Sequence, residues 1–202
     1  MGLLGRLFGE QHRAGDQGPP LARTSTEARL YMDLHPCGCG EAEPPQDSAM
    51  IKMVDGLASR FSGACPRCGT EREFVFRMPE QITMPEVGVV TFGDGTPSEL
   101  LDPGEWLWVA DQYASASGTD ASGLDPKARR AVRQRVATAA AAVDEVLAFL
   151  PETAKKVPVS AFRTDRGRSV YAAEPGRFTR DRLRTARESY REILDELDAK
   201  AS

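Results

Sequence analysis

Apolar and polar residues alternate along residues 30–79, which is the period of a β-strand whose two faces meet different surroundings. Two of the alternating runs flank the dipeptide Asp55-Gly56, the strongest short-range signal for a β-hairpin. The expected strands cover residues 30–34, 50–54, 57–61 and 74–78. The pattern therefore predicts a small antiparallel sheet in this part of the chain.

The apolar pattern changes to a helical period in the C-terminal half, where the start signals are clear. Thr96-Pro-Ser-Glu99 and Asp102-Pro-Gly-Glu105 each have the form of a capping box with proline at the first helical position. Asp125-Pro126 predicts the start of a third helix that continues to about residue 150. A short helix is expected between residues 157 and 178, and a last helix over residues 180–199.

All four cysteines lie in the alternating region, in two short turns. The first is His35-Pro-Cys37-Gly-Cys39-Gly and the second is Cys65-Pro-Arg-Cys68-Gly. A turn of this kind suits a metal ion, because its backbone N–H groups point at sulfur and stabilise thiolate while glycine accepts the positive φ that closes the turn. Four thiolates at about 2.3 Å complete a tetrahedral shell with no open position, which is the structural kind of zinc site.

With the strands around it, this arrangement resembles the zinc-ribbon fold group over residues 30–79. The second turn matches the usual pattern of that group, whereas the first is Cys-x-Cys and is one residue short. We expect one structural Zn²⁺, held by a closed set of four ligands. These ligands are Cys37, Cys39, Cys65 and Cys68.

Three alternatives stay open at these cysteines. Rubredoxin-like iron sites use similar turns, so iron is an alternative to zinc. A redox Cys-x-x-Cys pair is the second, although such a pair normally opens a helix and this one precedes a predicted strand. His35, two residues before Cys37, is an alternative ligand in place of one cysteine.

Composition sets expectations about the compartment and the partners. The chain has 202 residues and a formal net charge of −4, which gives no reason to expect general affinity for nucleic acid. No apolar run approaches the roughly 20 residues of a membrane helix. No export signal is recognisable either, so we expect a cytoplasmic protein whose thiols stay reduced. Arginine greatly outnumbers lysine, which is typical of a GC-rich bacterial genome.

Pattern and charge divide the chain into three parts, and the expected fold class is α+β. Residues 1–29 are predicted to be a flexible lead-in, whose apolar start is either a frayed terminus or a docking peptide. Residues 30–80 are the expected zinc β-ribbon, and residues 81–202 combine an acidic connector with a mainly α-helical domain. The connector, residues 81–125, has eight acidic residues and no Lys or Arg, whereas residues 126–202 have 17 basic and 11 acidic residues.

The two long helices carry their charges against the helix dipole, with basic residues first and acidic residues last. Each misplaced end charge costs roughly 0.3–1 kcal/mol when exposed. Antiparallel packing of the two helices, within one chain or across a homodimer, would set each basic half beside an acidic half. An anionic partner is the alternative. The candidate anion or partner contacts are Arg129, Arg130, Arg133, Arg184 and Arg187.

These features favour a small cytoplasmic zinc-binding protein that serves as an adaptor or assembly component for a protein partner. The first alternative is a nucleic-acid-binding module that combines the ribbon with the arginine-rich helix halves, although residues 31–80 carry eight acidic against five basic residues. The second is an enzyme whose site cannot be read from the sequence. Catalysis has little support, because no phosphate-binding loop, nucleophile elbow or His-Glu-x-x-His motif is present.

Overall fold

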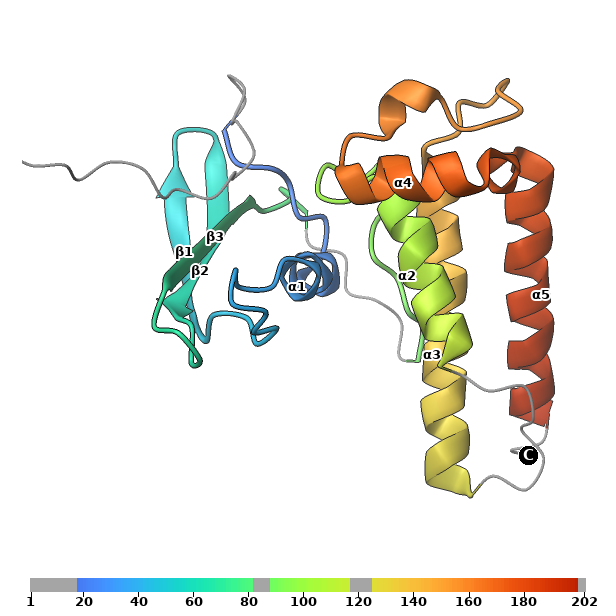
Figure 1. Cartoon of the computed structure of the whole chain (residues 1–202), viewed down its shortest axis with the longest axis horizontal. Helices are drawn as coiled ribbons and strands as arrows, with labels where there is room; N and C mark the ends of the chain where they lie inside the picture. Colours follow the sequence, from blue (N-terminus) through green and yellow to red (C-terminus); the bar gives the residue numbers. More distant parts are fainter. Residues whose placement is uncertain (1–17, 82–87, 117–124, 200–202) are drawn as a thin grey trace, which may run out of the picture.

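The structure is a computed structural model that describes residues 18–81, 88–116 and 125–199. The apolar start of the chain, predicted to fray or to dock, lies outside these residues. The fold is α+β, as predicted: a three-stranded antiparallel sheet with one helix stands beside a bundle of helices (Figure 1). No helix among the described residues is both long enough and apolar enough to cross a membrane.

The described elements follow one another in two groups. The first group contains α1 (Ser25–Leu34), β1 (Asp47–Met53), β2 (Gly56–Ala64) and β3 (Glu71–Arg77). The second contains α2 (Pro103–Ser115), α3 (Pro126–Ala148), the 3-10 turn η1 (Val159–Ala161), α4 (Asp165–Ala173), the 3-10 turn η2 (Pro175–Phe178) and α5 (Arg180–Ala199). We call the first group with its loops the sheet unit and the second the helical bundle.

The predicted hairpin is present in the sheet, whose strand order is β1-β2-β3. The turn lies at Val54-Asp55. Met50 of β1 is opposite Ser59 of β2, which is in turn opposite Phe76 of β3. Helix α1 covers this face, because the Tyr31 ring meets Phe76 edge-on with the ring centroids 5.6 Å apart. The sheet core therefore lies between α1 and the strands.

The strand predicted over residues 30–34 is wrong, because these residues form the second half of α1. Their alternation has another cause. Residues two apart lie about 200° apart around a helix, and α1 runs between the sheet and the bundle (Figure 1). Leu30 and Met32 are therefore both buried, on different sides of the helix. Helix α1 begins at Ser25, within residues 1–29, which were predicted to be a flexible lead-in. The division of the chain into three parts stays a prediction.

The capping box predicted at Asp102 is confirmed at the start of α2. The Asp102 carboxylate accepts from the backbone N–H groups of Gly104 and Glu105 at 2.9 and 3.0 Å, and Glu105 accepts from Asp102 N–H at 3.1 Å. The box predicted at Thr96-Pro-Ser-Glu99 is wrong, because no helix follows it. Glu99 instead pairs with Arg77 of β3 at 2.8 Å, so a contact distant in sequence replaces the local cap.

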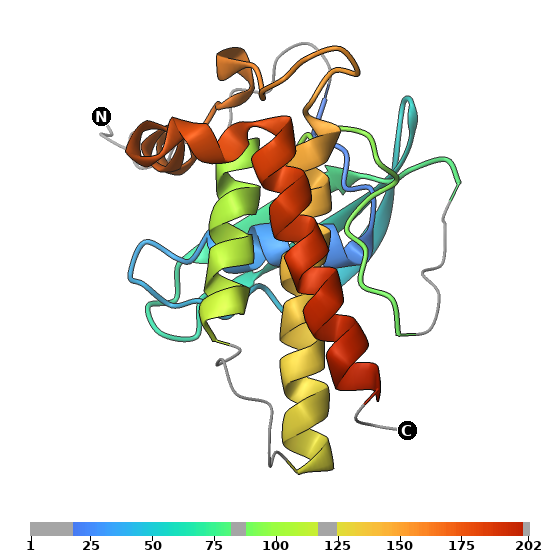
Figure 2. The ribbon, with the colours of Figure 1, turned by 90° about the vertical axis from the view of Figure 1, so that its right-hand side faces the viewer.

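Helices α3 and α5 pack antiparallel within one chain, as the charge pattern predicts (Figure 2). Arg133, in the first half of α3, pairs with Asp198 near the end of α5 at 2.6 Å. Arg187, in the first half of α5, pairs with Asp144 near the end of α3 at 3.3 Å. Each basic half thus lies beside an acidic half, which offsets the unfavourable placement against the helix dipole.

A buried group of polar side chains, the junction cluster, joins α1 to the bundle. Arg23 precedes α1, and its Nη2 lies 2.6 Å from Glu27 Oε1 and 2.5 Å from Glu145 Oε2 of α3. Its Nη1 donates to the carbonyl of Thr96, and the Ser98 hydroxyl donates to Glu27 at 2.6 Å. Two carboxylates thus share one guanidinium in a place that excludes solvent, which fixes the sheet unit against the bundle.

Candidate metal centre

The first pair of cysteines lies in a tight turn, the first knuckle (residues 37–40), directly after α1. Gly40 N–H donates to the carbonyl of Cys37 at 2.7 Å, and Cys37 N–H donates to the carbonyl of Glu41 at 2.8 Å. The φ of Gly40 is 87°, which favours glycine. The backbone therefore turns back on itself and directs both cysteines of this knuckle to one side.

The second knuckle (residues 65–69) joins β2 to β3 and repeats this arrangement with one more residue. Gly69 N–H donates to the carbonyl of Cys65 at 2.8 Å, and Cys65 N–H donates to the carbonyl of Thr70 at 2.8 Å. Gly69 has a φ of 72°, in the same region as Gly40. The missing residue in the first knuckle therefore shortens the turn without changing how it closes.

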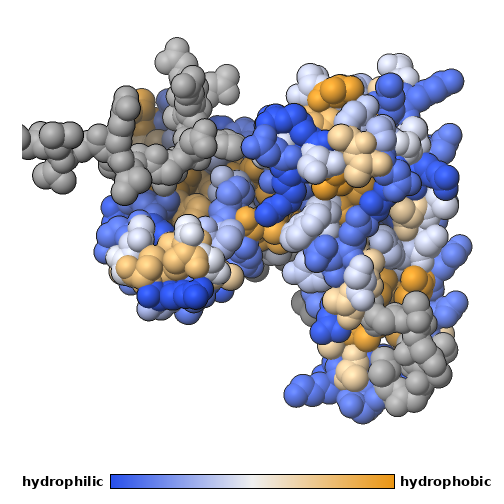
Figure 3. Space-filling view, viewed as in Figure 1, coloured by the Kyte–Doolittle hydropathy of each residue, from blue (hydrophilic) through white to orange (hydrophobic). Residues whose placement is uncertain are grey.

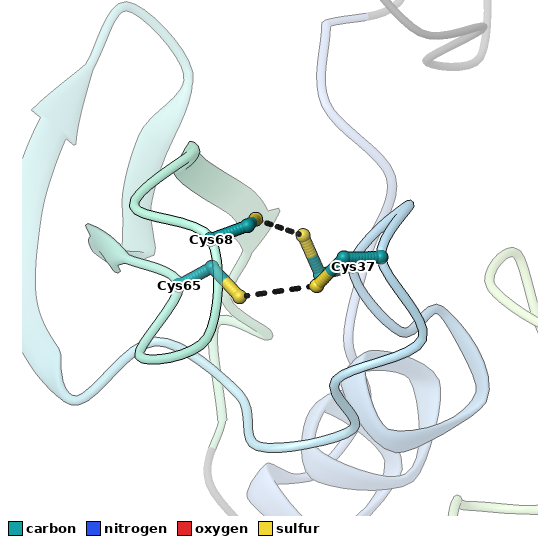
Figure 4. Close-up of side chains that lie close together, drawn as sticks. Cys37, Cys65 and Cys68 are labelled. Carbon is teal, nitrogen blue, oxygen red and sulfur yellow. Dashed lines mark hydrogen bonds between the residues drawn. The ribbon is translucent and has the colours of Figure 1, made fainter.

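The four cysteines come together across the two knuckles (Figure 4). Cys37 Sγ lies 3.6 Å from Cys68 Sγ, and Cys39 Sγ lies 3.6 Å from Cys65 Sγ. All four sulfurs lie within 4.8 Å of one another. A tetrahedron with metal–sulfur bonds of about 2.3 Å has sulfur–sulfur edges of about 3.8 Å. The cluster is therefore positioned to bind one metal ion.

Exposure divides the sulfur ligands into two classes. Cys37 and Cys65, the first cysteine of each knuckle, are buried with 7% and 3% of their surface exposed. Cys39 is half-buried and Cys68 is exposed. The centre therefore lies at the surface of the sheet unit, with one side closed by protein and the other facing solvent.

Hydrogen bonds shift the pKa values of two of the four thiols in opposite directions. Hydrogen bonds from the Thr70 side chain and backbone lower the pKa of Cys68 to about 6. At Cys39 the Glu41 backbone N–H acts to lower the pKa, but desolvation and hydrogen bonds with the other three cysteines outweigh it and raise the pKa to about 11. Thiolate is the form that binds metal, so a bound cation would displace the protons of these thiols.

Two arginines fasten the knuckles to each other and to α1. Arg67 in the second knuckle donates to the carbonyl of Cys39 at 3.1 Å. Arg72 of β3 donates to the carbonyls of His35 and Glu43, both at 2.7 Å. These bonds run between the segment after α1 and the β2–β3 connection, so they orient the same two turns that the sulfurs join.

His35 is outside the group of ligand atoms. Its Nδ1 donates to the carbonyl of Tyr31 at 2.7 Å, and its ring stacks on the Tyr31 ring with centroids 4.0 Å apart. The atoms that lie within 4.8 Å of one another belong to the four cysteines. The geometry thus favours four thiolates over a shell in which His35 replaces one of them.

The five arginines considered as anion contacts do not share one surface role. Arg133 and Arg187 form the ion pairs that join α3 to α5. Arg129 is half-buried, and its Nε is buried as well. Arg130 and Arg184 are exposed on the same two helices. Use of any of them by an anionic partner stays a prediction.

The junction cluster was missed in the sequence. The pattern Thr24-Ser-Thr-Glu27 has the form of a capping box and could have placed α1, whose N-cap is Thr24. Nothing local marks Arg23 or Glu145 as buried, because their contact spans 122 positions. Burial raises the pKa of Glu145 to about 7, against the attraction of Arg23 and with further repulsion from Glu27.

A cavity of about 230 Å³ lies beside the second knuckle. It is smaller than the roughly 300–1,000 Å³ of typical small-molecule sites. Cys65 and Arg72 line it, together with prolines and carboxylates but without histidine, serine or lysine. The Arg72 guanidinium already donates to two backbone carbonyls. The acid–base groups that line the cavity are therefore Cys65 and the carboxylates of Glu43 and Asp47.

No protein-family model, curated protein or solved structure gives a significant match to this chain. Interpretation of the centre therefore rests on its own geometry. Within the described residues that geometry consists of four convergent sulfurs on two glycine-closed turns, beside a three-stranded antiparallel sheet.

Proposed function

We propose that this chain is a small zinc-binding interaction protein whose Zn²⁺ has a structural role. The observation that carries the proposal is the pair of 3.6 Å sulfur–sulfur contacts between the two knuckles. Four thiolates form a closed shell with no open position for a substrate. Zinc fits this donor set, and iron is the alternative because it also binds four thiolates.

The metal would supply what the sheet unit lacks. The burial pattern of β1 contains no buried residue, and Ala58 and Phe76 are the buried side chains of β2 and β3. A unit of about 50 residues with so thin a core is marginal on its own. Structural zinc contributes roughly 10–16 kcal/mol in comparable peptides. Cys37, Cys39, Cys65 and Cys68 would hold the ion and thereby tie the end of α1 to the β2–β3 connection.

Native mass spectrometry of the purified chain tests the metal proposal directly. We expect about one Zn²⁺ per chain, and we expect the Cys68→Ser variant to lose it. Cys68 is exposed, so its replacement disturbs no buried packing. Protein that carries no metal when purified under reducing, chelator-free conditions would refute the proposal. If the purified protein carries iron, the metal of the site is iron and not zinc, and its structural role is unchanged.

The interaction part of the proposal rests on the hairpin. Met50, Val54 and Leu57 are 65%, 100% and 47% exposed, so three large apolar side chains of the β1–β2 hairpin lie in solvent. Grouped apolar residues on a surface mark interaction sites more often than single ones do. On the face shown in Figure 3, apolar residues of the bundle occur in small groups among hydrophilic ones. The hairpin is therefore the surface that we assign to a protein partner.

A comparison of two single substitutions tests this assignment. Leu57→Ser should abolish capture of a specific protein from a lysate of the native cell, because it removes apolar contact area. Val159→Ser is the matched control, since Val159 is 59% exposed on the bundle and should leave capture unchanged. Equal capture by both variants would refute the hairpin as the binding surface. Binding of DNA or RNA with a steep salt dependence would instead support the nucleic-acid alternative.

A further inference from the structure

The four sulfurs of the proposed zinc site are not equally open to reagents in solution. Cys68 is exposed and Cys39 is half-buried, whereas Cys37 and Cys65 are 7% and 3% exposed. Metal-bound thiolates are nucleophiles, and oxidation by a small molecule selects the sulfur that it can reach. The exposed Cys68 is therefore the point where an oxidant meets the centre.

Across the site, Cys68 faces a sulfur of the other knuckle. Cys37 Sγ is 3.6 Å away, and a disulfide needs a separation of about 2.05 Å. Cys39 and Cys65 form a second pair of the same kind, also at 3.6 Å. Each pair joins one cysteine of the first knuckle to one of the second (Figure 4). Disulfides formed along these two contacts would keep the knuckles together after the metal has left.

We propose that the centre is a site of reversible oxidation by hydroperoxides, in which Cys68 reacts first and Cys37 resolves it as a disulfide. This proposal rests on the proposed zinc site. The Cys68 thiolate attacks one oxygen of hydrogen peroxide, the O–O bond breaks, and a sulfenic acid forms. The second oxygen leaves as hydroxide and takes up one proton to give water. The Cys37 thiolate then attacks the Cys68 sulfur, the S–O bond breaks, and a second water leaves.

Atoms and electrons balance over these two reaction steps. Two thiolates, one hydrogen peroxide and two protons give one disulfide and two waters, so the two sulfurs are oxidised by two electrons and the peroxide is reduced by two. Two of the four ligands are lost in the process, and two thiolates do not hold Zn²⁺ in a closed shell. Zinc is therefore released, and a thiol reductant restores the site.

Thr70 restrains this reaction. Its hydroxyl lies 3.2 Å from Cys68 Sγ, within reach to donate a hydrogen bond once Cys68 is a thiolate. A hydrogen bond to a thiolate stabilises the anion and lowers its nucleophilicity. Thr70 is not a metal ligand, so its replacement changes the reactivity of Cys68 and leaves the donor set intact. This residue offers a variant that separates reactivity from metal binding.

Limited oxidation of the zinc-loaded full chain tests the proposal. One equivalent of hydrogen peroxide is added, free thiols are blocked with N-ethylmaleimide, and released zinc and disulfides are measured by a chromogenic chelator and peptide mass spectrometry. We expect the first disulfide to join Cys37 to Cys68, with release of the metal in step. A first disulfide inside one knuckle, or zinc retained in excess peroxide, would overturn the proposal.

Thr70→Val should release zinc roughly three- to tenfold faster than the natural chain, and Thr70→Ser should match the natural rate because it keeps the hydroxyl. Equal rates for the two variants would mean that Cys68 is not the reacting sulfur, which also overturns the proposal. Metal content before oxidation keeps the two proposals apart. A chain without zinc at the start refutes the zinc site, whereas a loaded chain that resists peroxide refutes the oxidation alone.

Discussion

The sheet unit and the helical bundle reach a folded state by different means. In the bundle, Trp106, Leu101, Val146 and Phe178 are fully buried, in an apolar core that also takes in Leu30 and Met32 of α1 and Phe76 of β3. In the sheet, β1 contributes no buried residue and most side chains of β2 and β3 are partly exposed. Apolar burial stabilises the bundle and α1, whereas the strands bury little and would gain most from a cross-link. The four-cysteine cluster provides the ligands for one.

The junction cluster decides how far the two regions depend on each other. Arg23 and Glu27 belong to the sheet unit, and Glu145 belongs to the bundle. Their side chains are almost fully buried, so the contact is strong only while all three remain paired. The comparison can thus be tested at the metal, at the junction and at the bundle surface, in decreasing order of expected effect.

The largest effect is expected at the metal. Cys65→Ser leaves three thiolates, which cannot close the tetrahedron, so the metal is lost and the sheet unit is destabilised by several kcal/mol. Hydrogen exchange followed by mass spectrometry should show lost protection in β2 and β3 and retained protection in α2 and α3. Ala64→Ser is the matched control, since it adds a hydroxyl at the exposed neighbouring position. Simultaneous loss in both regions would show that the bundle depends on the sheet unit.

The next effect is expected at the junction. Arg23→Met removes the cation that two buried carboxylates share, and breaking such a group costs about 3–5 kcal/mol. Chemical denaturation should report this loss. Arg29→Met is the control, because Arg29 and Asp33 are 3.7 Å apart with side chains 62% and 50% exposed, and an exposed pair contributes at most about 1 kcal/mol. Equal losses of unfolding free energy in the two variants would show that the junction cluster contributes no more than an exposed ion pair.

A smaller effect is expected from pH. Burial raises the folded-state pKa of Glu145 to about 7, above its ordinary value of 4.5. The folded chain therefore binds more protons than the unfolded chain between these values, and stability falls as pH rises through this window. Glu145→Gln lacks this titration. From pH 5 to pH 8 the natural chain should lose roughly 1–3 kcal/mol relative to the variant. Parallel stability curves for the two proteins would contradict the assignment.

Features whose cause is local were predictable from the sequence. The turn at Asp55, the two glycine-closed knuckles and the capping box at Asp102 each depend on a few neighbouring residues, and the structure contains all of them. The convergence of the cysteines was also predictable, because a hairpin between two knuckles returns the second to the first. The antiparallel pairing of α3 and α5 was predictable from charge, since opposite signs occur at opposite ends of both helices.

Features set by contacts distant in sequence were not predictable in the same way. Residues 30–34 alternate like a strand because two different surfaces bury α1, and only the assembled fold shows both. Glu99 has the residue type of a capping box, but Arg77 of β3 takes its carboxylate. The partners of Arg23 come from three separate segments of the chain. In each case the deciding partner lies on another element.

The smallest effect is expected on the surface of the bundle, where the arginines separate packing from partner binding. Arg133 and Asp198 are 36% and 50% exposed, and Arg187 and Asp144 are 26% and 44% exposed. Such pairs contribute about 0–1 kcal/mol, and reversal adds repulsion. Arg133→Glu and Arg187→Glu should therefore each lower stability by about 1 kcal/mol in a thermal melt, less at high salt because screening weakens the pairs.

Arg184→Glu is the control for this pair of variants. Arg184 is exposed and forms no ion pair with any described residue, so its reversal should change stability by less than about 0.5 kcal/mol. A glutamate in the first turns of α5 is also favoured slightly by the helix dipole. If the arginines instead form a surface for a polyanion, Arg133→Glu and Arg187→Glu would leave the melt unchanged or raise it while abolishing retention of RNA or DNA. Packing and polyanion binding therefore predict opposite changes in the thermal melt of these two variants. We expect a loss of stability, because the ion pairs at 2.6 and 3.3 Å join the two helices.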